Sequence, residues 1–288
     1  MALYAFDGTG NEDRPGTDRD SNVLHFFNAY QDPPMPGAAA RRSLYIEGIG
    51  VRAHTPIGDV LAKTFGLAAR QRLREARQRL ARNLADGDAT VDIVGFSRGA
   101  ALAVDFANHV CKEVEAANVR FVGVWDIVAQ FGLPGEHVNL GFDLDCPDVV
   151  AYHAMAIDEN RALFPLTRML RDDKPVDGFV EAWFRGVHSD VGGGNGNRGL
   201  NWISLHWMLK AAQREHLPIL QSEIDRNLAD RARPQQIRIH TVAAGVRRHI
   251  FDTDLLHASV QPISGRADGP EMLLPRIDDD GIVRQVQA

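Results

Sequence analysis

The sequence has little of several features that mark whole classes of protein. Among its 288 residues only two are cysteines, Cys111 and Cys146, too few for a disulfide framework or a cysteine-based metal cluster. We expect both to be small buried side chains in a reducing compartment. Basic residues do not exceed acidic ones, and the formal net charge is -6. This charge argues against nucleic acid as a partner.

Long apolar runs are also lacking. No stretch reaches the roughly 18 to 20 apolar residues of a membrane-spanning helix, so contact with lipid would have to be peripheral. The segment Met1–Asp7 has no basic residues ahead of its short apolar run, unlike a secretory signal peptide. We therefore expect a chain that is cytoplasmic where it is made and does not use the Sec route.

Hydrophobic residues make up 44% of the sequence, enough for a large buried core in a chain of this length. Short apolar runs alternate with longer helical patterns, the order typical of β-α-β units. This order predicts an α/β fold with a mostly parallel central sheet and helices on both faces. The expected strands are Leu3–Phe6, Ser43–Ile46, Val91–Gly95, Val119–Trp125, Val180–Phe184 and Ile237–Ala243.

Helical periodicity is clearest over Phe65–Ala85, where apolar residues recur three to four positions apart. Gly87 follows it as a C-cap. A second helix should begin after Ser97 and run through Asn108, and a third should cover Leu200–Arg214. These helices would cover the faces of the predicted sheet.

Two other parts of the chain have a different character. The segment Pro134–Asp177 shows little strand character, and we expect it to form a helical cap or lid within a catalytic domain of residues 1–263. From Ser264 to Ala288 the chain is polar and rich in glycine, proline and aspartate, which is typical of a loosely packed tail. The cap should place apolar side chains over the cleft, namely Leu163, Phe164, Leu166 and Met169.

One pentapeptide points to the chemistry. Gly95-Phe96-Ser97-Arg98-Gly99 has the G-x-S-x-G form of a nucleophile elbow, which is informative only between a strand and a helix. A β-rich run precedes it here and an alanine-rich helix start follows it. The two glycines permit a turn too tight for a Cβ, and the helix N-terminus favours developing negative charge. We expect Ser97 to be the nucleophile of a serine hydrolase of the α/β-hydrolase type.

A serine hydroxyl needs a histidine to take its proton and a carboxylate to fix that histidine's tautomer. Eleven histidines are present. We expect His188 to serve, because it follows the strand Val180–Phe184 on a loop that can reach the cleft. Other histidines lie inside helical patterns, among them His25, His109, His206 and His216.

Two acids compete to orient this histidine. Asp126 ends the strand after the nucleophile's strand and should emerge beside Ser97, so we predict that it is the third member of the triad. Asp190 is only two residues from His188 and is expected to order the glycine loop that follows it. A rival pairing of Asp190 with His257 stays open.

The oxyanion hole of such an enzyme is built from backbone N–H groups. One should come from Arg98, the residue after the nucleophile. Another should come from the loop after the first strand, where Gly8 or Thr9 can donate. Asp7 itself would repel an oxyanion, so we expect it to brace this loop through hydrogen bonds. The chemistry requires neither a cofactor nor a metal.

Five segments, in this order along the chain, resemble a known family. They are Phe6–Asn11, Gly95–Ala100, Val124–Val128, Tyr152–Arg161 and Trp183–Gly194. They resemble the catalytic domain of type VI secretion lipase effectors, and the similarity spans about residues 2 to 260. The family's Ser, Asp and His fall on Ser97, Asp126 and His188.

The resemblance implies a phospholipase A-like esterase that acts on glycerophospholipid. It further implies peripheral membrane contact, a secretion-spike or immunity protein as partner, and delivery to other cells by a Sec-independent system. Two functions of other classes stay open from the residues alone. One is a catalytically silent hydrolase fold that only binds, and the other is a metal-assisted hydrolase using Asp7 and Asp190, since oxygen-rich loops suit calcium.

Overall fold

The structure is a computed structural model of the chain. It describes residues 1–11, 19–32, 41–49, 58–129, 143–169, 177–196, 198–231, 247–261 and 270–286. The strands are β1 (Ala2–Phe6), β2 (Leu44–Ile46), β3 (Thr90–Phe96), β4 (Asn118–Trp125), β5 (Val150–Ala156), β6 (Phe179–Phe184), β7 (Leu255–His257), β8 (Arg276–Ile277) and β9 (Val283–Arg284). The helices are α1 (Asn22–Ala29), α2 (Gly58–Ala85), α3 (Ser97–Glu113), α4 (His188–Gly192), α5 (Arg198–Arg214) and α6 (Gln221–Arg231), with a 3₁₀ turn at Pro270–Leu273.

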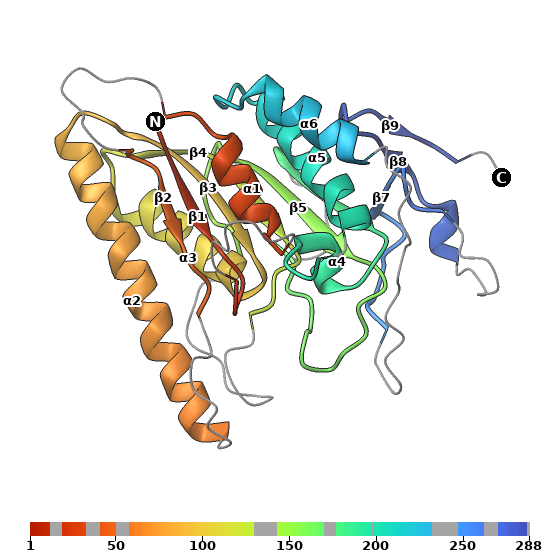
Figure 1. The fold of residues 1–288 in the computed structure, drawn as a ribbon, viewed down its shortest axis with the longest axis horizontal. Helices are drawn as coiled ribbons and strands as arrows, with labels where there is room; N and C mark the ends of the chain where they lie inside the picture. The colour runs from red at the N-terminus through yellow and green to blue at the C-terminus, as the bar shows by residue number, and fades with distance from the viewer. Residues whose placement is uncertain are drawn as a thin grey trace.

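The strands form one sheet in the order β2-β1-β3-β4-β5-β6-β7-β8-β9. Strands β1 to β8 run parallel to their neighbours, and β9 pairs with β8 in the antiparallel direction. Helices α2 and α3 pack on one face of this sheet, and α1, α5 and α6 pack on the other (Figure 1). The predicted α/β fold with a mostly parallel, two-sided sheet is confirmed.

The alternation of side chains along β1 explains why both faces are covered. Tyr4 and Phe6 point into the core beneath α2 and α3, whereas Leu3 and Ala5 point toward α1 and α5. All four side chains are buried. Because successive residues of a strand face opposite sides, an unbroken apolar run requires helices on both faces.

Most of the predicted elements are present, although α2 begins seven residues earlier and α3 ends five residues later than predicted. The first five predicted strands correspond to β1, β2, β3, β4 and β6, and the three predicted helices to α2, α3 and α5. Gly87 follows α2 with a positive φ of 81°, and its N–H donates to the carbonyl of Leu84, as a C-cap does. The strand predicted at Ile237–Ala243 lies outside the described residues.

The helical cap is a wrong prediction for the described part of its range. Residues 143–169 contain β5, which lies between β4 and β6 near the middle of the sheet, and no helix. Val150–Ala156 mixes small apolar residues with Tyr152 and His153, so it lacks the uniform β-branched run of a typical central strand. Its neighbours bury it on both faces nonetheless.

The loosely packed tail also needs correction within residues 270–286. Strand β8 pairs with β7 in the main sheet. Leu274 and Ile277 are buried, each against a different core cluster. These two apolar side chains are separated by polar and proline residues, so the sequence composition concealed them.

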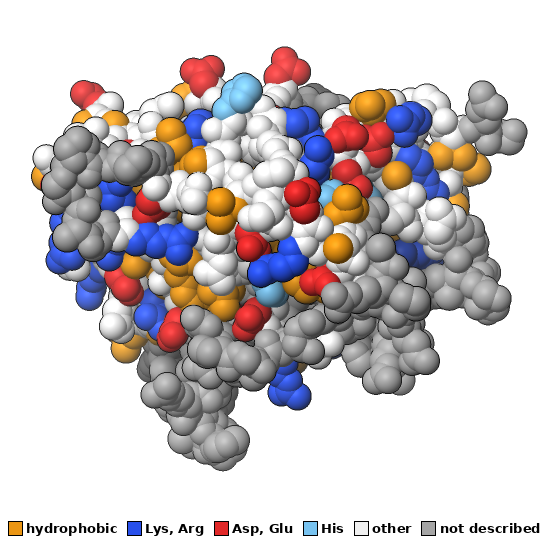
Figure 2. Space-filling view, turned by 45° about the horizontal axis from the view of Figure 1, so that its top comes forward, with side chains coloured by type: hydrophobic (Ala, Val, Ile, Leu, Met, Phe, Trp, Pro, Cys, Tyr) orange, Lys and Arg blue, Asp and Glu red, His pale blue; other side chains and the backbone are white. Residues whose placement is uncertain are grey.

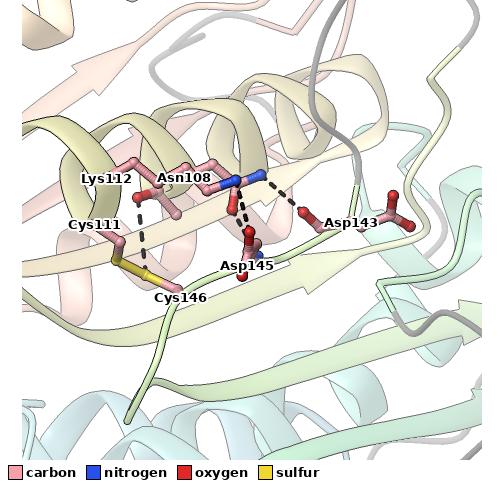
Figure 3. The surroundings of a disulfide bond; sticks show 7 residues. Asn108, Cys111, Lys112, Asp143, Asp145 and Cys146 are labelled. Atoms are coloured by element: carbon pink, nitrogen blue, oxygen red, sulfur yellow. Dashed lines mark hydrogen bonds and ion pairs between the residues drawn. A yellow bond between two sulfur atoms is a disulfide. The ribbon is translucent and has the colours of Figure 1, made fainter.

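The cysteines are joined, contrary to the sequence-based expectation. Cys111 near the end of α3 forms a disulfide with Cys146, ahead of β5, with Cα atoms 5.5 Å apart (Figure 3). Polar contacts run alongside it: Asn108 Nδ2 donates to the Asp143 carbonyl, and the Lys112 ammonium lies 2.7 Å from an Asp145 carboxylate oxygen. This disulfide could not be predicted from the sequence, because it depends on how the segment before β5 lies against α3 in the folded protein.

The surface of the described residues is mixed in charge. Figure 2 shows acidic and basic side chains interspersed over one face of the molecule. Among the described residues, no helix combines the length and hydrophobicity that crossing a membrane requires.

Candidate active site

The candidate site lies where parallel strands end at one edge of the sheet. Ser97 directly follows β3, Asp126 follows β4, and His188 lies four residues beyond β6. Strand β4 is the direct neighbour of β3, and the pairing runs from Thr90 opposite Asn118 to Phe96 opposite Trp125, with a shift in register between Val91 and Asp92. Asp126 therefore emerges beside Ser97, as the sequence predicted, and ligands of such sheets bind at this edge.

Ser97 occupies the tight turn that its motif predicts. Its φ is 58°, a left-handed conformation that costs energy for a residue other than glycine. A Cβ on Gly95 would lie 2.7 Å from the Cα of Ala100, and one on Gly99 would lie 2.3 Å from the carbonyl oxygen of Asp7. The turn can thus form only because both flanking positions lack a side chain.

The imidazole of His188 bridges the other two predicted residues. Its Nε2 lies 2.8 Å from Ser97 Oγ, and its Nδ1 lies 2.6 Å from Asp126 Oδ2. The ring also contacts the tilted rings of Phe96 and Phe164, whose centroids are 4.6 and 4.9 Å away. The histidine is therefore held by two aromatic rings and by contacts at both of its nitrogens.

The backbone of His188 is fixed as well. It is the first residue of α4, and its N–H donates to Glu159 Oε2 at 3.1 Å. Glu159 in turn forms a forked ion pair with Arg161, whose guanidinium lies over the Phe164 ring. The segment after β5 thus contacts His188 twice: Glu159 binds its backbone N–H, and Phe164 packs against its ring.

Asp126 is fully buried and accepts hydrogen bonds on both oxygens. Besides His188, the backbone N–H of Ala156 donates to Oδ1 at 2.8 Å. The guanidinium of Arg248 binds both oxygens, with Nη1 2.5 Å from Oδ1 and Nη2 2.9 Å from Oδ2. The sequence reasoning did not identify Arg248.

These contacts set the charge states of the pair. Burial alone would raise the pKa of Asp126, but the Arg248 charge and the His188 hydrogen bond outweigh it and hold that pKa well below its usual range. Burial lowers the pKa of His188, and Asp126 opposes this shift. Both shifts favour an ionised Asp126 beside a neutral imidazole, whose Nε2 faces Ser97 Oγ.

Asp7 braces the loop after β1, as expected. Its Oδ1 accepts from the N–H of Gly8 and the amide of Asn11, and its Oδ2 accepts from the hydroxyls of Ser21 and Tyr45. Burial raises the pKa of Asp7, and these four donors oppose that shift. The carboxylate is fully engaged in holding the loop.

Two of the three predicted oxyanion residues, Thr9 and Arg98, line a small pocket. Arg98 and Gly99 of the elbow line it together with the loop after β1, and both apolar and charged side chains complete its wall; Ser97 is not among the lining residues. The N–H of Gly8 already donates to Asp7, which removes it from the predicted donors and leaves those of Thr9 and Arg98. The lining residues are Phe6, Asp7, Thr9, Ile46, Glu47, Ile49, Arg72, Arg98, Gly99 and Leu102.

Asp190 serves the loop of α4 and does not pair with His257. It accepts from the N–H of Val187 and the amide of Asn195. The nitrogens of His257 contact Ser259 Oγ and Asp279 Oδ1 instead, which makes the rival pairing wrong. Among the described residues, no group of three His, Cys, Asp or Glu side chains could hold a metal ion.

The apolar side chains expected over the cleft separate into two groups. Phe164 lies against His188, and Leu163 beside it is 65% exposed. Met169 and Leu166 instead pack into core clusters away from the histidine. A short loop after β5 thus contributes Phe164 where a helical cap was predicted.

The chain is similar to one protein family and to two solved structures. The profile of the family described as "T6SS, Phospholipase effector Tle1-like, catalytic domain" matches residues 3–112 and 106–211. A crystal structure of an uncharacterized protein from Pseudomonas aeruginosa is 20% identical with a TM-score of 0.55, covering 80% of this chain and 48% of that one. It shows the same fold.

A structure described as the Tle1 effector bound to the VgrG spike from the type 6 secretion system is 24% identical, with a TM-score of 0.47. The match covers 69% of this chain and 51% of that one. The chain therefore spans about half the length of both structures. A comparison with curated proteins gave no match.

Proposed function

Since the chain belongs to the Tle1-like catalytic domain family of type VI secretion phospholipase effectors, we propose that it is a serine hydrolase that cleaves carboxylic esters of phospholipids. The observation that carries the proposal is the continuous set of contacts from Asp126 through His188 to Ser97. The reaction would proceed through an acyl-enzyme intermediate and would require no cofactor.

In the first half of the reaction, Ser97 Oγ attacks the ester carbonyl carbon while His188 Nε2 takes the hydroxyl proton. Asp126 keeps the proton on Nδ1 and stabilises the imidazolium that forms. The tetrahedral intermediate then collapses, the bond to the alcohol oxygen breaks, and the imidazolium returns its proton to that oxygen. An acyl group remains on Ser97.

In the second half, His188 takes a proton from water, whose oxygen attacks the acyl carbon. The second tetrahedral intermediate releases the carboxylic acid, and the proton on Nε2 returns to Ser97 Oγ. The backbone N–H groups of Arg98 and Thr9 are the proposed oxyanion donors, since the start of α3 and the loop after β1 meet there.

The surroundings of the elbow suit a lipid ester. Phe6, Ile46 and Leu102 line the pocket beside Arg98, together with the charged Glu47 and Arg72, and each methylene buried among the apolar side chains contributes about 0.8 kcal/mol. Leu163 is exposed next to Phe164, near the histidine. We place peripheral contact with a membrane surface on this side of the molecule.

The biological setting follows from the family rather than from the site. Type VI effectors are delivered by a Sec-independent system, so a secretion-spike protein and an immunity protein are the proposed partners. The protein would be cytoplasmic in the cell that makes it.

The proposal is tested by comparing the wild type with Ser97→Ala on p-nitrophenyl esters and on phosphatidylglycerol-containing vesicles. Loss of the nucleophile should lower kcat by on the order of 10⁴ to 10⁶, with an unchanged circular dichroism spectrum. Release of fatty acid from vesicles by the wild type supports phospholipid as substrate. If the Ser97→Ala variant retains more than about a tenth of wild-type turnover, given the cost of losing a triad member, Ser97 is not the nucleophile.

A further inference from the structure

We propose that Arg248 is a positioning residue of this site: its guanidinium clamps Asp126 against His188 and ties the Phe164 loop to the same carboxylate. The inference rests on the proposed role of Ser97, His188 and Asp126. Arg248 reaches Asp126 across 122 positions of sequence and touches neither Ser97 nor any atom that would react.

Both terminal nitrogens of the Arg248 guanidinium make two hydrogen bonds each, whereas its buried Nε has no partner among the described residues. Nη1 donates to Asp126 Oδ1 and to the carbonyl of Ala156 at 2.8 Å. Nη2 donates to Asp126 Oδ2 and to the carbonyl of Phe164 at 3.1 Å. The side chain is only 6% exposed. One planar group thus joins the end of β4, the end of β5 and the loop beyond it.

This arrangement requires a guanidinium. A bidentate fork matches the two oxygens of a carboxylate, and the outer N–H groups remain free for the two carbonyls. A lysine ammonium could supply the charge but could not make all four contacts in one plane. Charge and geometry can therefore be separated by substitution.

The positive charge of Arg248 is needed because Asp126 is buried. Asp126 has no exposed surface, and an isolated carboxylate in such a place would take up a proton rather than stay ionised. A protonated Asp126 would no longer hold the His188 proton on Nδ1. Arg248 supplies the positive charge that keeps Asp126 ionised before His188 becomes charged during the reaction.

The same charge acts on His188. Burial is the largest cause that lowers the pKa of His188, and Arg248 lowers it further. Asp126 and Glu159 raise it. Asp190 lies on the same short helix. Loss of Arg248 removes a positive neighbour, so the pKa of His188 should rise. As the pH is lowered, His188 should then be protonated earlier, and activity should be lost at a higher pH than in the wild type.

The second consequence concerns Phe164. Its ring covers one face of His188, and its carbonyl is held by Arg248. The same guanidinium therefore fixes the acid of the triad and the aromatic cover of the histidine. Loosening it should misplace both groups, and a misplacement of about 1 Å can cost up to about 100-fold in rate.

The test measures the rate at which a fluorophosphonate probe labels the protein between pH 5 and 9, which needs no knowledge of the natural substrate. Arg248→Gln should slow labelling by about 10- to 100-fold and move the acidic limb upward by about 0.5 to 1 pH unit. Arg248→Lys should keep the limb near its wild-type pH while labelling more slowly, because it retains charge without the fork.

Arg120→Gln is the matched control. Arg120 also binds a fully buried carboxylate with two nitrogens, but its partner is Asp92 in the middle of β3, away from the elbow. Its loss should lower thermal stability and leave the acidic limb in place. If Arg248→Gln behaves like Arg120→Gln, Arg248 has only a structural role.

The outcomes separate the two proposals. If the wild type is not labelled at all, the serine-hydrolase proposal fails. If the wild type is labelled at Ser97 and Arg248→Gln shows an unshifted limb or an unchanged rate, only the role of Arg248 is overturned. If Arg248→Gln does not fold, the rate and limb of Arg248→Lys decide: a rate equal to that of the wild type, or a displaced limb, contradicts the proposal.

Discussion

At the scale of single residues, the site has to keep the buried carboxylate of Asp126 charged although water cannot reach it. Asp126 meets this requirement with four donors: the imidazole, two guanidinium nitrogens and one backbone N–H. Each donor favours the ionised form, and together they exceed the cost of burial. Burial and the Arg248 charge lower the pKa of His188, and its Nε2 is turned to Ser97.

The contrast between the two candidate acids is testable by parallel substitutions. Asp126→Asn should lower kcat by up to about 10⁴, because an amide admits the wrong histidine tautomer. Asp190→Asn should cost about 1 kcal/mol of stability through the weakened cap of α4 and leave most of the activity. Steady-state ester hydrolysis and thermal unfolding of both variants check this. A fully active Asp126→Asn variant would contradict the assignment.

Local signals made part of this site predictable. Ser97 stands in a motif with a defined strand and helix on either side, and Asp126 and His188 follow apolar strands. Arg248 has no such signal, because a lone arginine far along the chain looks like any other surface residue. Only the buried state of Asp126 creates a need for it, and burial depends on the tertiary structure.

Among the elements, α3 and the end of β1 make a close contact that leaves no room for a side chain at Gly99. Gly99 lies in the first turn of the helix, where a Cβ would come within 2.4 Å of two carbonyl oxygens, those of Phe6 and Asp7. This closeness sets the first turn of α3 directly beside the loop that carries Thr9. The elbow and the proposed oxyanion donors are therefore placed by one helix–strand contact.

A methyl group at Gly99 should disturb both stability and catalysis. Gly99→Ala should lower the free energy of unfolding by about 1 to 3 kcal/mol, as overpacking does. It should also reduce kcat by a larger factor than it changes KM, because the oxyanion donors shift relative to Ser97. Gly66→Ala in α2 is the control, since a Cβ there meets nothing within 4 Å and should stabilise the helix by up to about 1 kcal/mol. Equal stability and kcat for the two variants would refute the role given to this contact.

The elements that were missed share a physical cause. Strand β5 has few β-branched residues and carries His153, yet that histidine is fully buried and bonded to Glu181 and to the N–H of Ile127. Helix α4 is too short to show a period. In both cases tertiary partners, and not local preference, determine the structure.

The molecule as a whole is a two-sided sheet whose helices and loops converge on one edge. The disulfide between Cys111 and Cys146 ties the end of α3 to the segment before β5, so the helix that begins at Ser97 is anchored at both ends. Composition indicated the fold class correctly, because hydrophobic content and alternation are properties of the whole chain. It could not indicate the disulfide, which depends on how distant segments meet.

The most direct test of the central claim is to identify the residue modified by a fluorophosphonate probe, using peptide mass spectrometry of the labelled protein. The account predicts one adduct on Ser97, with labelling abolished in Ser97→Ala and strongly slowed in His188→Ala. An adduct on another residue, or labelling of Ser97→Ala at the wild-type rate, would contradict it.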